Sequence, residues 1–102
     1  MKELPKQFSG KGQVKGYEFN QISATPYGYI YAKTSAEGSK TFEVFKRLEN
    51  AIYNCISYPT DKAFGIWAWN PGTKERALKI LLEIGEREGA KKLKLNAVNS
   101  PP

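Results

Sequence analysis

A single amphipathic helix near the C-terminus, preceded by short strand-like segments, is the feature that most restricts how this chain can fold. The turn residues Asn70–Gly72 come directly before Thr73, whose hydroxyl can accept a hydrogen bond from a free N–H group of a first helical turn. The apolar residues that follow at helical spacing are Ala77, Leu78, Leu81 and Ile84. Gly89 suits the position at which a helix ends. The pattern therefore predicts a helix over Thr73–Glu88 that covers one face of a sheet.

The residues before this helix have the alternation and the aromatic or β-branched composition of strands. Around Gly16 the apolar residues change from even-numbered to odd-numbered positions, which predicts a bend there. We expect strands at Gly12–Ile22, Tyr27–Thr34, Thr41–Leu48, Ala51–Tyr58 and Phe64–Trp69, of which the last two are either separate strands or halves of one bent strand. Their short connections favour antiparallel pairing. The expected fold class is α+β: an antiparallel β-meander of four to five strands with one C-terminal helix packed on one face.

The chain of 102 residues is long enough for one domain. We expect residues 12–89 to form that single α+β domain. Residues 1–11 show no periodicity, and the sequence predicts a flexible basic segment there. In residues 90–102, Leu93 and Leu95 alternate with lysines, which is typical of either a basic tail or a short edge strand.

The formal net charge of +6 lies entirely at the two ends of the chain. Residues 1–16 contribute +3 and residues 90–102 another +3, whereas residues 17–89 hold nine basic and nine acidic residues. Basic ends of this kind are found in nucleic-acid-binding arms, and they also serve solubility alone. The charge thus permits a nucleic-acid partner without requiring one.

The sequence offers no feature of a secreted or membrane protein. Residues 1–16 are rich in Lys and Gly, and no segment approaches the ~20 apolar residues that a membrane span needs. The only cysteine, Cys55, excludes an intramolecular disulfide and any multi-cysteine metal site. We therefore expect a cytoplasmic protein without a membrane partner.

Side chains alternate between the two faces of a sheet, so parity sorts the predicted strands. One face is mostly aliphatic and consists of Ile30, Ala32, Phe42, Val44, Ile52, Ile56, Phe64, Ile66 and Ala68. The other face is aromatic with interleaved charges and consists of Tyr27, Tyr29, Tyr31, Lys33, Glu43, Phe45, Arg47, Tyr53, Cys55, Trp67 and Trp69. One helix covers only one face, so the sequence predicts an uncovered aromatic face, which marks a binding surface. The alternative is that the first strand folds across the aromatic face and completes a second core.

The residues that most enzymes need are missing. The chain has no histidine and one aspartate, Asp61, which lies in a predicted turn. Neither a nucleotide-binding fingerprint nor a nucleophile motif is present. We therefore expect a protein that is not an enzyme and that has no metal site and no cofactor.

Two kinds of partner remain open for the aromatic face. Aromatic sheet faces bind single-stranded DNA or RNA by base stacking. The predicted binding residues are Tyr27, Tyr29, Tyr31, Lys33, Phe45, Arg47, Tyr53, Trp67 and Trp69, and the predicted phosphate contacts are Lys46, Lys91, Lys92 and Lys94. Tyrosine, tryptophan and arginine also anchor protein interfaces, so the same face equally suits a protein partner or a homodimer. Nucleic-acid binding is the leading hypothesis, and a protein-binding regulator or inhibitor is the alternative.

Overall fold

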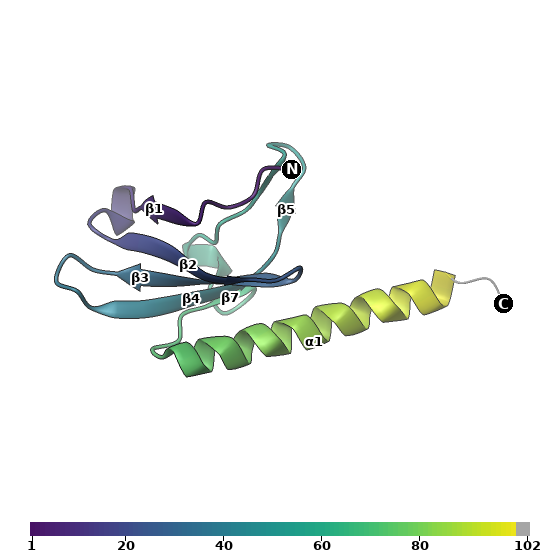
Figure 1. The fold of residues 1–102 in the computed structure, drawn as a ribbon. Helices are drawn as coiled ribbons and strands as arrows, with labels where there is room; N and C mark the ends of the chain where they lie inside the picture. The colour runs from purple at the N-terminus through teal and green to yellow at the C-terminus, as the bar shows by residue number, and fades with distance from the viewer. Residues whose placement is uncertain (100–102) are drawn as a thin grey trace.

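The computed structural model describes the backbone of residues 1–99 and the side chains of residues 1–91. The fold is α+β, with a five-stranded antiparallel sheet and one C-terminal helix packed against it (Figure 1). The sheet strands in spatial order are β1 (Gln7–Ser9), β2 (Glu18–Ala24), β3 (Gly28–Thr34), β4 (Lys40–Lys46) and β7 (Ala68–Trp69). The remaining elements are the hairpin β5 (Glu49–Asn50) and β6 (Cys55–Ile56), the 3-10 turns η1 (Gly12–Val14) and η2 (Asp61–Ala63), and α1 (Lys74–Asn99). The predicted fold class is confirmed.

The hairpin of β3 and β4 forms the centre of the sheet. Its strands pair over their whole length, from Gly28 opposite Lys46 to Thr34 opposite Lys40. The connecting loop is closed by a hydrogen bond from the Ser35 N–H group to the Ser39 carbonyl at 2.8 Å, and Gly38 adopts a φ of 90° that side chains with a Cβ rarely reach. The predicted hairpin is confirmed.

The first predicted strand begins later than expected. Residues Gly12–Val14 form η1, Gly16 has a φ of 96°, and β2 starts only at Glu18. The bend at Gly16 is thus confirmed, whereas a strand that begins at Gly12 is wrong. The register against β3 also shifts between Gln21 and Ser23, so a bulge changes the parity again before the strand ends.

The helix-facing side of the sheet holds an aliphatic core. The side chains of β3 and β4 that pack there are Ile30, Ala32, Phe42 and Val44, and they meet Ala77, Leu81 and Ile84 of α1. The helix contacts β3 and β4. On β2, by contrast, the helix side of the sheet carries a polar residue. Asn20 pairs with Ala32 and so lies on the same side, where a polar residue is suitable because the helix does not reach it.

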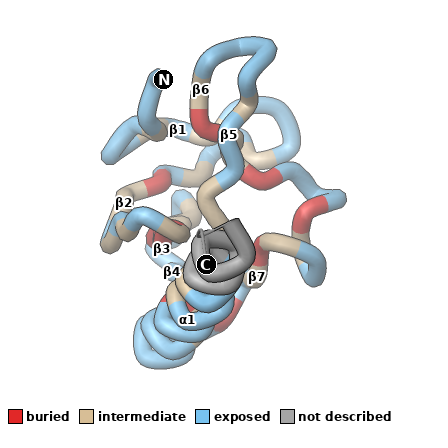
Figure 2. The backbone as a smooth tube through the Cα atoms, turned by 90° about the vertical axis from the view of Figure 1, so that its right-hand side faces the viewer, coloured by how far each residue is buried: buried red, intermediate tan, exposed pale blue. Residues whose placement is uncertain are grey.

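The opposite side of the sheet holds a second core. Its buried members are Phe19, Tyr29, Tyr31, Phe45, Ile56, Ala63 and Ala68, and Phe8, Tyr58 and Trp67 pack against them. Figure 2 shows buried positions scattered through the strands and loops on both sides of the sheet, while the outer surface of α1 is exposed. The expectation of an uncovered aromatic face is therefore wrong, because its side chains form a second core together with residues from other segments.

The N-terminal segment supplies part of that cover. Within residues 1–11, Gln7–Ser9 form β1 and pair with β2. The Lys2 N–H group donates to the Asn54 carbonyl at 2.8 Å, and the Tyr31 hydroxyl donates to the Pro5 carbonyl at 2.6 Å. The expectation of a loosely ordered segment is wrong here, because its hydrogen bonds go to distant residues that no local pattern reveals.

Two predicted strands are mostly turn. Ala51–Asn54 form the turn between β5 and β6, where the Asn50 side-chain oxygen accepts hydrogen bonds from the N–H groups of Ile52 and Tyr53. In the Phe64–Trp69 segment only Ala68 and Trp69 are strand. These turns break the alternation, so Ile52 and Ile66 are exposed, while Ile56, Phe64 and Ala68 pack with the aromatic core rather than against the helix.

The helix begins as predicted and ends later. The Thr73 hydroxyl accepts a hydrogen bond from the Arg76 N–H group at 3.2 Å, which confirms the N-cap. The helix continues through Gly89 to Asn99, so the predicted end at Glu88 and the predicted edge strand after it are wrong. Glycine inside a helix costs only about 1 kcal/mol, so Gly85 and Gly89, which face the Tyr27 side chain, do not end this helix.

Candidate functional site

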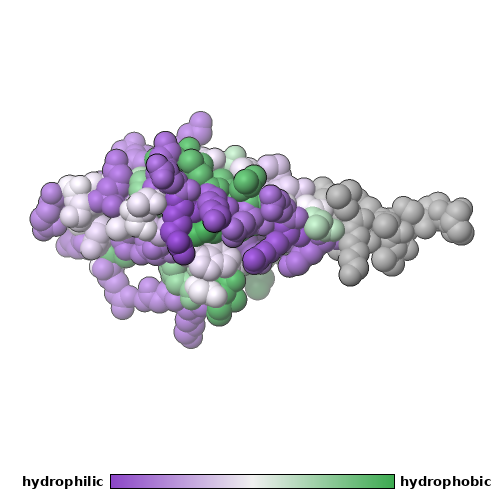
Figure 3. Space-filling model, turned by 90° about the horizontal axis from the view of Figure 1, so that it is seen from below, coloured by the Kyte–Doolittle hydropathy of each residue, from purple (hydrophilic) through white to green (hydrophobic). Residues whose placement is uncertain are grey.

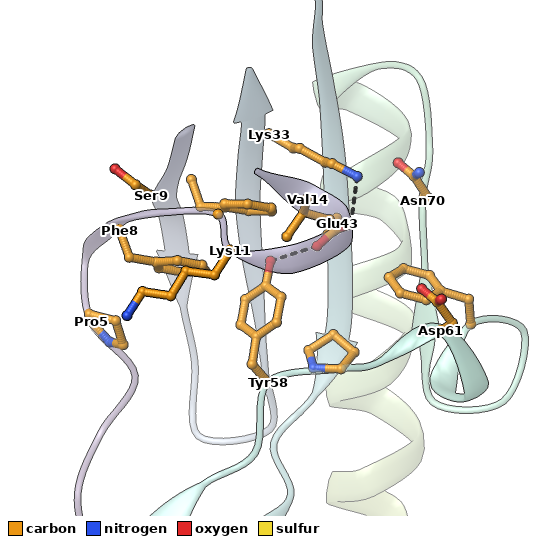
Figure 4. A pocket seen from close by; sticks show the side chains of 14 residues that line it. Pro5, Phe8, Ser9, Lys11, Val14, Lys33, Glu43, Tyr58, Asp61 and Asn70 are labelled. Atoms are coloured by element: carbon orange, nitrogen blue, oxygen red, sulfur yellow. Dashed lines mark hydrogen bonds and ion pairs between the residues drawn. The ribbon is translucent and has the colours of Figure 1, made fainter. Parts of the chain in front are cut away.

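A pocket of about 570 Å³ opens between the N-terminal segment, η1, η2 and the neighbouring ends of β3 and β4 (Figure 4). Its aromatic walls are Phe8, Phe19, Tyr58 and Phe64, and we call it the aromatic pocket. The Phe8 and Phe19 rings are stacked with centroids 4.7 Å apart, and Tyr58 meets Phe8 edge-on at 5.2 Å. Pockets with apolar walls and a few polar groups are the usual form of a ligand site.

A buried carboxylate lies at the inner wall of the aromatic pocket. Glu43, only 5% exposed, accepts a hydrogen bond from the Tyr58 hydroxyl at 2.6 Å, and its other oxygen lies 3.9 Å from the Lys33 ammonium group. Burial and the neighbouring Glu43 charge raise the pKa of Tyr58 well above its usual value, so its hydroxyl stays protonated and keeps donating. Both carboxylate oxygens of Glu43 therefore have a partner, and the Lys33 charge partly offsets the Glu43 charge.

Cationic side chains border the same pocket. Lys11 lines it, and Figure 4 shows this side chain beside Phe8. The other lysines of the same segment are Lys2, Lys6 and Lys15. None of these four forms an ion pair with a side chain that the structure describes. Asp61 and Asn70 lie on the opposite rim. Of these four lysines Lys11 alone lines the aromatic pocket, where Lys33 is the other cationic residue.

The central residues of the predicted aromatic face are buried. Tyr29, Tyr31 and Phe45 lie in the second core, and the hydroxyls of the two tyrosines are held in hydrogen bonds. Burial raises the pKa of Tyr29 and Tyr31. A base cannot stack on these rings while the covering layer is in place, so the prediction of an open aromatic platform is wrong.

The other predicted aromatic residues are dispersed. Tyr27 and Trp69 pack against the helix-side core, which is the opposite side of the sheet from the one predicted. Trp67 is half-buried against Phe45, with ring centroids 6.3 Å apart. Tyr53 is 77% exposed at the tip of the β5–β6 hairpin. Of the predicted binding residues, only Lys33 lines the aromatic pocket.

The predicted cationic contacts are mostly in ion pairs. Arg47 binds Glu3 at 2.7 Å, and both Lys46 and Lys91 approach Glu88, at 3.2 and 3.5 Å. These two lysines lower the pKa of Glu88, chiefly through the hydrogen bond from Lys46. Lys92 and Lys94 lie in α1, but their side chains are outside the described residues.

Several pocket residues escape sequence reasoning. Phe8 lies in a segment without periodicity, and Tyr58 and Phe64 flank η2, where the chain leaves strand geometry. One signal was available in the sequence, because Glu43 falls among the aromatic positions by parity. A carboxylate on an apolar face requires partners, and those partners define the inner wall of the pocket.

Comparison with family models, curated proteins and solved structures finds no match to this chain. Among the described residues, no helix combines the length and apolar composition of a membrane crossing. The same part of the chain has no cluster of three or more His, Cys, Asp or Glu side chains suited to a metal ion.

Proposed function

We propose that the protein is a non-enzymatic module that binds single-stranded nucleic acid. In this proposal a base enters the aromatic pocket and the phosphates follow the lysines of the N-terminal segment. The observation that carries it is the position of Lys11, which lines the pocket beside Phe8 without an ion-pair partner among the described side chains. A cytoplasmic location is part of the same proposal.

The aromatic walls support a base as the ligand. Stacking on an aromatic side chain is worth ~1–3 kcal/mol per base and suits every base, because each has a π-face. Phe8 and Phe64 are only partly buried, so their rings remain accessible from the pocket. They replace the buried Tyr29, Tyr31 and Phe45 as the stacking surface.

The distribution of charge supports an anionic strand. The neutral balance of residues 17–89 argues against phosphate binding at the middle of the chain, but Lys11 of the N-terminal region adds a positive charge to the pocket wall, beside Lys33. Lys33 lies 3.9 Å from one Glu43 oxygen and partly offsets that charge, while the Tyr58 hydroxyl donates to the other oxygen. Asp61 is the remaining acidic group of the lining.

The test is a fluorescence titration of Trp67 and Trp69 with single-stranded DNA and RNA at several salt concentrations. Affinity should fall steeply as salt rises, because bound phosphates release counterions. Lys11→Ala should reduce the slope of log K against log salt by about 0.7. Phe64→Ala should weaken binding by ~1–3 kcal/mol and leave that slope unchanged.

A matched control separates the pocket from overall charge. Arg87→Ala removes the same charge from α1, on the other side of the sheet, where Arg87 lines a separate depression with Trp69 and Ile80. It should change affinity far less than Lys11→Ala does. An absence of binding to either nucleic acid at low salt, or equal effects of the two variants, would refute the proposal.

A further inference from the structure

The outer side of α1 carries apolar side chains that the fold leaves exposed. Leu78 is 46% exposed and Leu82 is 65% exposed. They border a groove of about 480 Å³ whose other wall is Tyr27, from the turn before β3. Figure 3 views the molecule from below, the side on which α1 lies, and shows hydrophobic surface among the hydrophilic side chains there. Exposed apolar surface bordered by charge is typical of an interface.

Two opposite charges lie on the exposed surface of the helix next to this groove: Glu86 is part of its lining, and Lys79 lies just outside it. Lys79 and Glu86 are seven residues apart, so they lie on the same side of α1, about 10 Å from each other along its axis. Leu82 lies between them, and Glu86 itself lines the groove. Neither Lys79 nor Glu86 has an ion-pair partner among the described side chains.

We propose that this groove is the interface of a symmetric dimer with a second copy of the chain. The two α1 helices pack antiparallel, with the two-fold axis beside Leu82. This arrangement places Lys79 of each copy opposite Glu86 of the other, so both charges are paired twice. The interface is isologous, since each copy contributes the same surface.

The charge pattern is the reason for choosing a second copy as the occupant. On each helix, a positive group and a negative group lie symmetrically about an apolar centre. Two such helices have complementary charges when they pack antiparallel, and this complementarity fixes their register. The leucines of the two copies then cover each other. The interface lies on the other side of the sheet from the aromatic pocket, so it neither requires nor excludes nucleic-acid binding.

Sedimentation velocity over a range of protein concentrations tests the proposal. The wild type should pass from monomer to dimer as concentration rises. Lys79→Glu should weaken dimerisation about tenfold or more, since it replaces two attractions by two repulsions. The double variant Lys79→Glu/Glu86→Lys should restore it, because the exchanged charges are again complementary. Arg87→Glu, a charge reversal on the part of α1 that lines the separate depression with Trp69 and Ile80, should leave it unchanged.

Cross-linking provides a second measurement that does not depend on charge. In a Cys55→Ser background, Leu82→Cys should oxidise to a covalent dimer because the two copies of this position meet near the axis. Arg87→Cys should not. A wild type that remains monomeric at every concentration, or a double variant no better than Lys79→Glu alone, would overturn the proposal. Oligonucleotide binding by a monomeric protein would leave the pocket proposal standing while removing this one.

Discussion

Glu3 and its partners show how single side chains fasten the N-terminal segment to the sheet. The Glu3 carboxylate binds Arg47 at 2.7 Å and accepts a hydrogen bond from the Tyr29 hydroxyl at 2.9 Å. The Arg47 guanidinium also donates to the Tyr29 hydroxyl, and Glu3 raises the pKa of Arg47, which therefore stays charged. These contacts fix one end of the layer that covers the aromatic core.

This anchor should weaken in acid. The hydrogen bond from Arg47, and then the one from Tyr29, lower the pKa of Glu3 below its ordinary value of 4.5. A carboxyl group whose pKa is lower in the folded state stabilises the fold above its unfolded pKa, and this contribution disappears as the pH falls through the folded pKa. Glu3→Gln should thus lower the urea midpoint at pH 7 and have a smaller effect near pH 3.

The control for this prediction is Glu37→Gln, in the loop between β3 and β4. That residue is exposed and forms no ion pair with a described side chain. Its substitution should leave the urea midpoint unchanged at both pH values. If Glu3→Gln remained as destabilising at pH 3 as at pH 7, the carboxylate would not be the anchoring group.

At the level of elements, α1 presents two different apolar surfaces. Ala77, Leu81 and Ile84 are buried against β3 and β4, while Leu78 and Leu82 are exposed on the adjoining side. Adjacent leucines on one helix therefore have opposite environments. The helix is held to the sheet by the first set, and the second set remains available for another surface.

The pair Leu81 and Leu82 allows a direct test of this division. Leu81→Ala should lower the free energy of unfolding by ~2–5 kcal/mol, the range for truncation of a buried leucine. Leu82→Ala, measured at a concentration where the protein is monomeric, should change it by about 0.5 kcal/mol or less. Denaturant unfolding followed by circular dichroism gives both values. Similar losses for the two variants would mean that the helix packs through a different face.

At the level of the whole molecule, one sheet separates two cores of different composition. The helix side is aliphatic and is covered by one long element. The other side is aromatic and is covered by pieces distant in sequence, namely the N-terminal segment and the chain between β6 and β7. Figure 1 shows these pieces on the side of the sheet away from α1. Such a cover depends on many long-range contacts, so its parts should not be separable from the domain.

Deletion of residues 1–9 tests that conclusion. The shortened chain should lose stability and bind a hydrophobic dye such as ANS, because the aromatic core loses β1 and Phe8. Phe8→Ala should act in the same direction, by up to about 3 kcal/mol. Gln7→Ala is the control, since Gln7 is exposed on the same strand. An unchanged unfolding midpoint after the deletion would mean that the segment is dispensable.

Local chemistry was enough to predict the central elements of the fold. The Thr73 cap, the β3–β4 hairpin and the apolar spacing of α1 depend on neighbouring residues, so the sequence alone determines the α+β class and the members of the aliphatic core on β3, β4 and α1. The other predicted members of that face lie elsewhere, namely Ile52, Ile56, Phe64, Ile66 and Ala68. The sequence also places the excess charge at the two ends of the chain. Of the candidate site, sequence reasoning identified Lys33 but not the rings that surround it.

Only the tertiary structure decided what covers the aromatic face. Phe8 and Tyr58 reach Tyr31 from segments more than 20 residues away, and these contacts leave no periodic trace in the sequence. The turns at Ala51–Asn54 and around η2 also reversed the expected faces, because one non-strand residue inverts every later side chain. The periodicity of apolar residues and the secondary-structure propensities describe short-range order. The pocket, in contrast, forms where distant segments of the chain pack against each other.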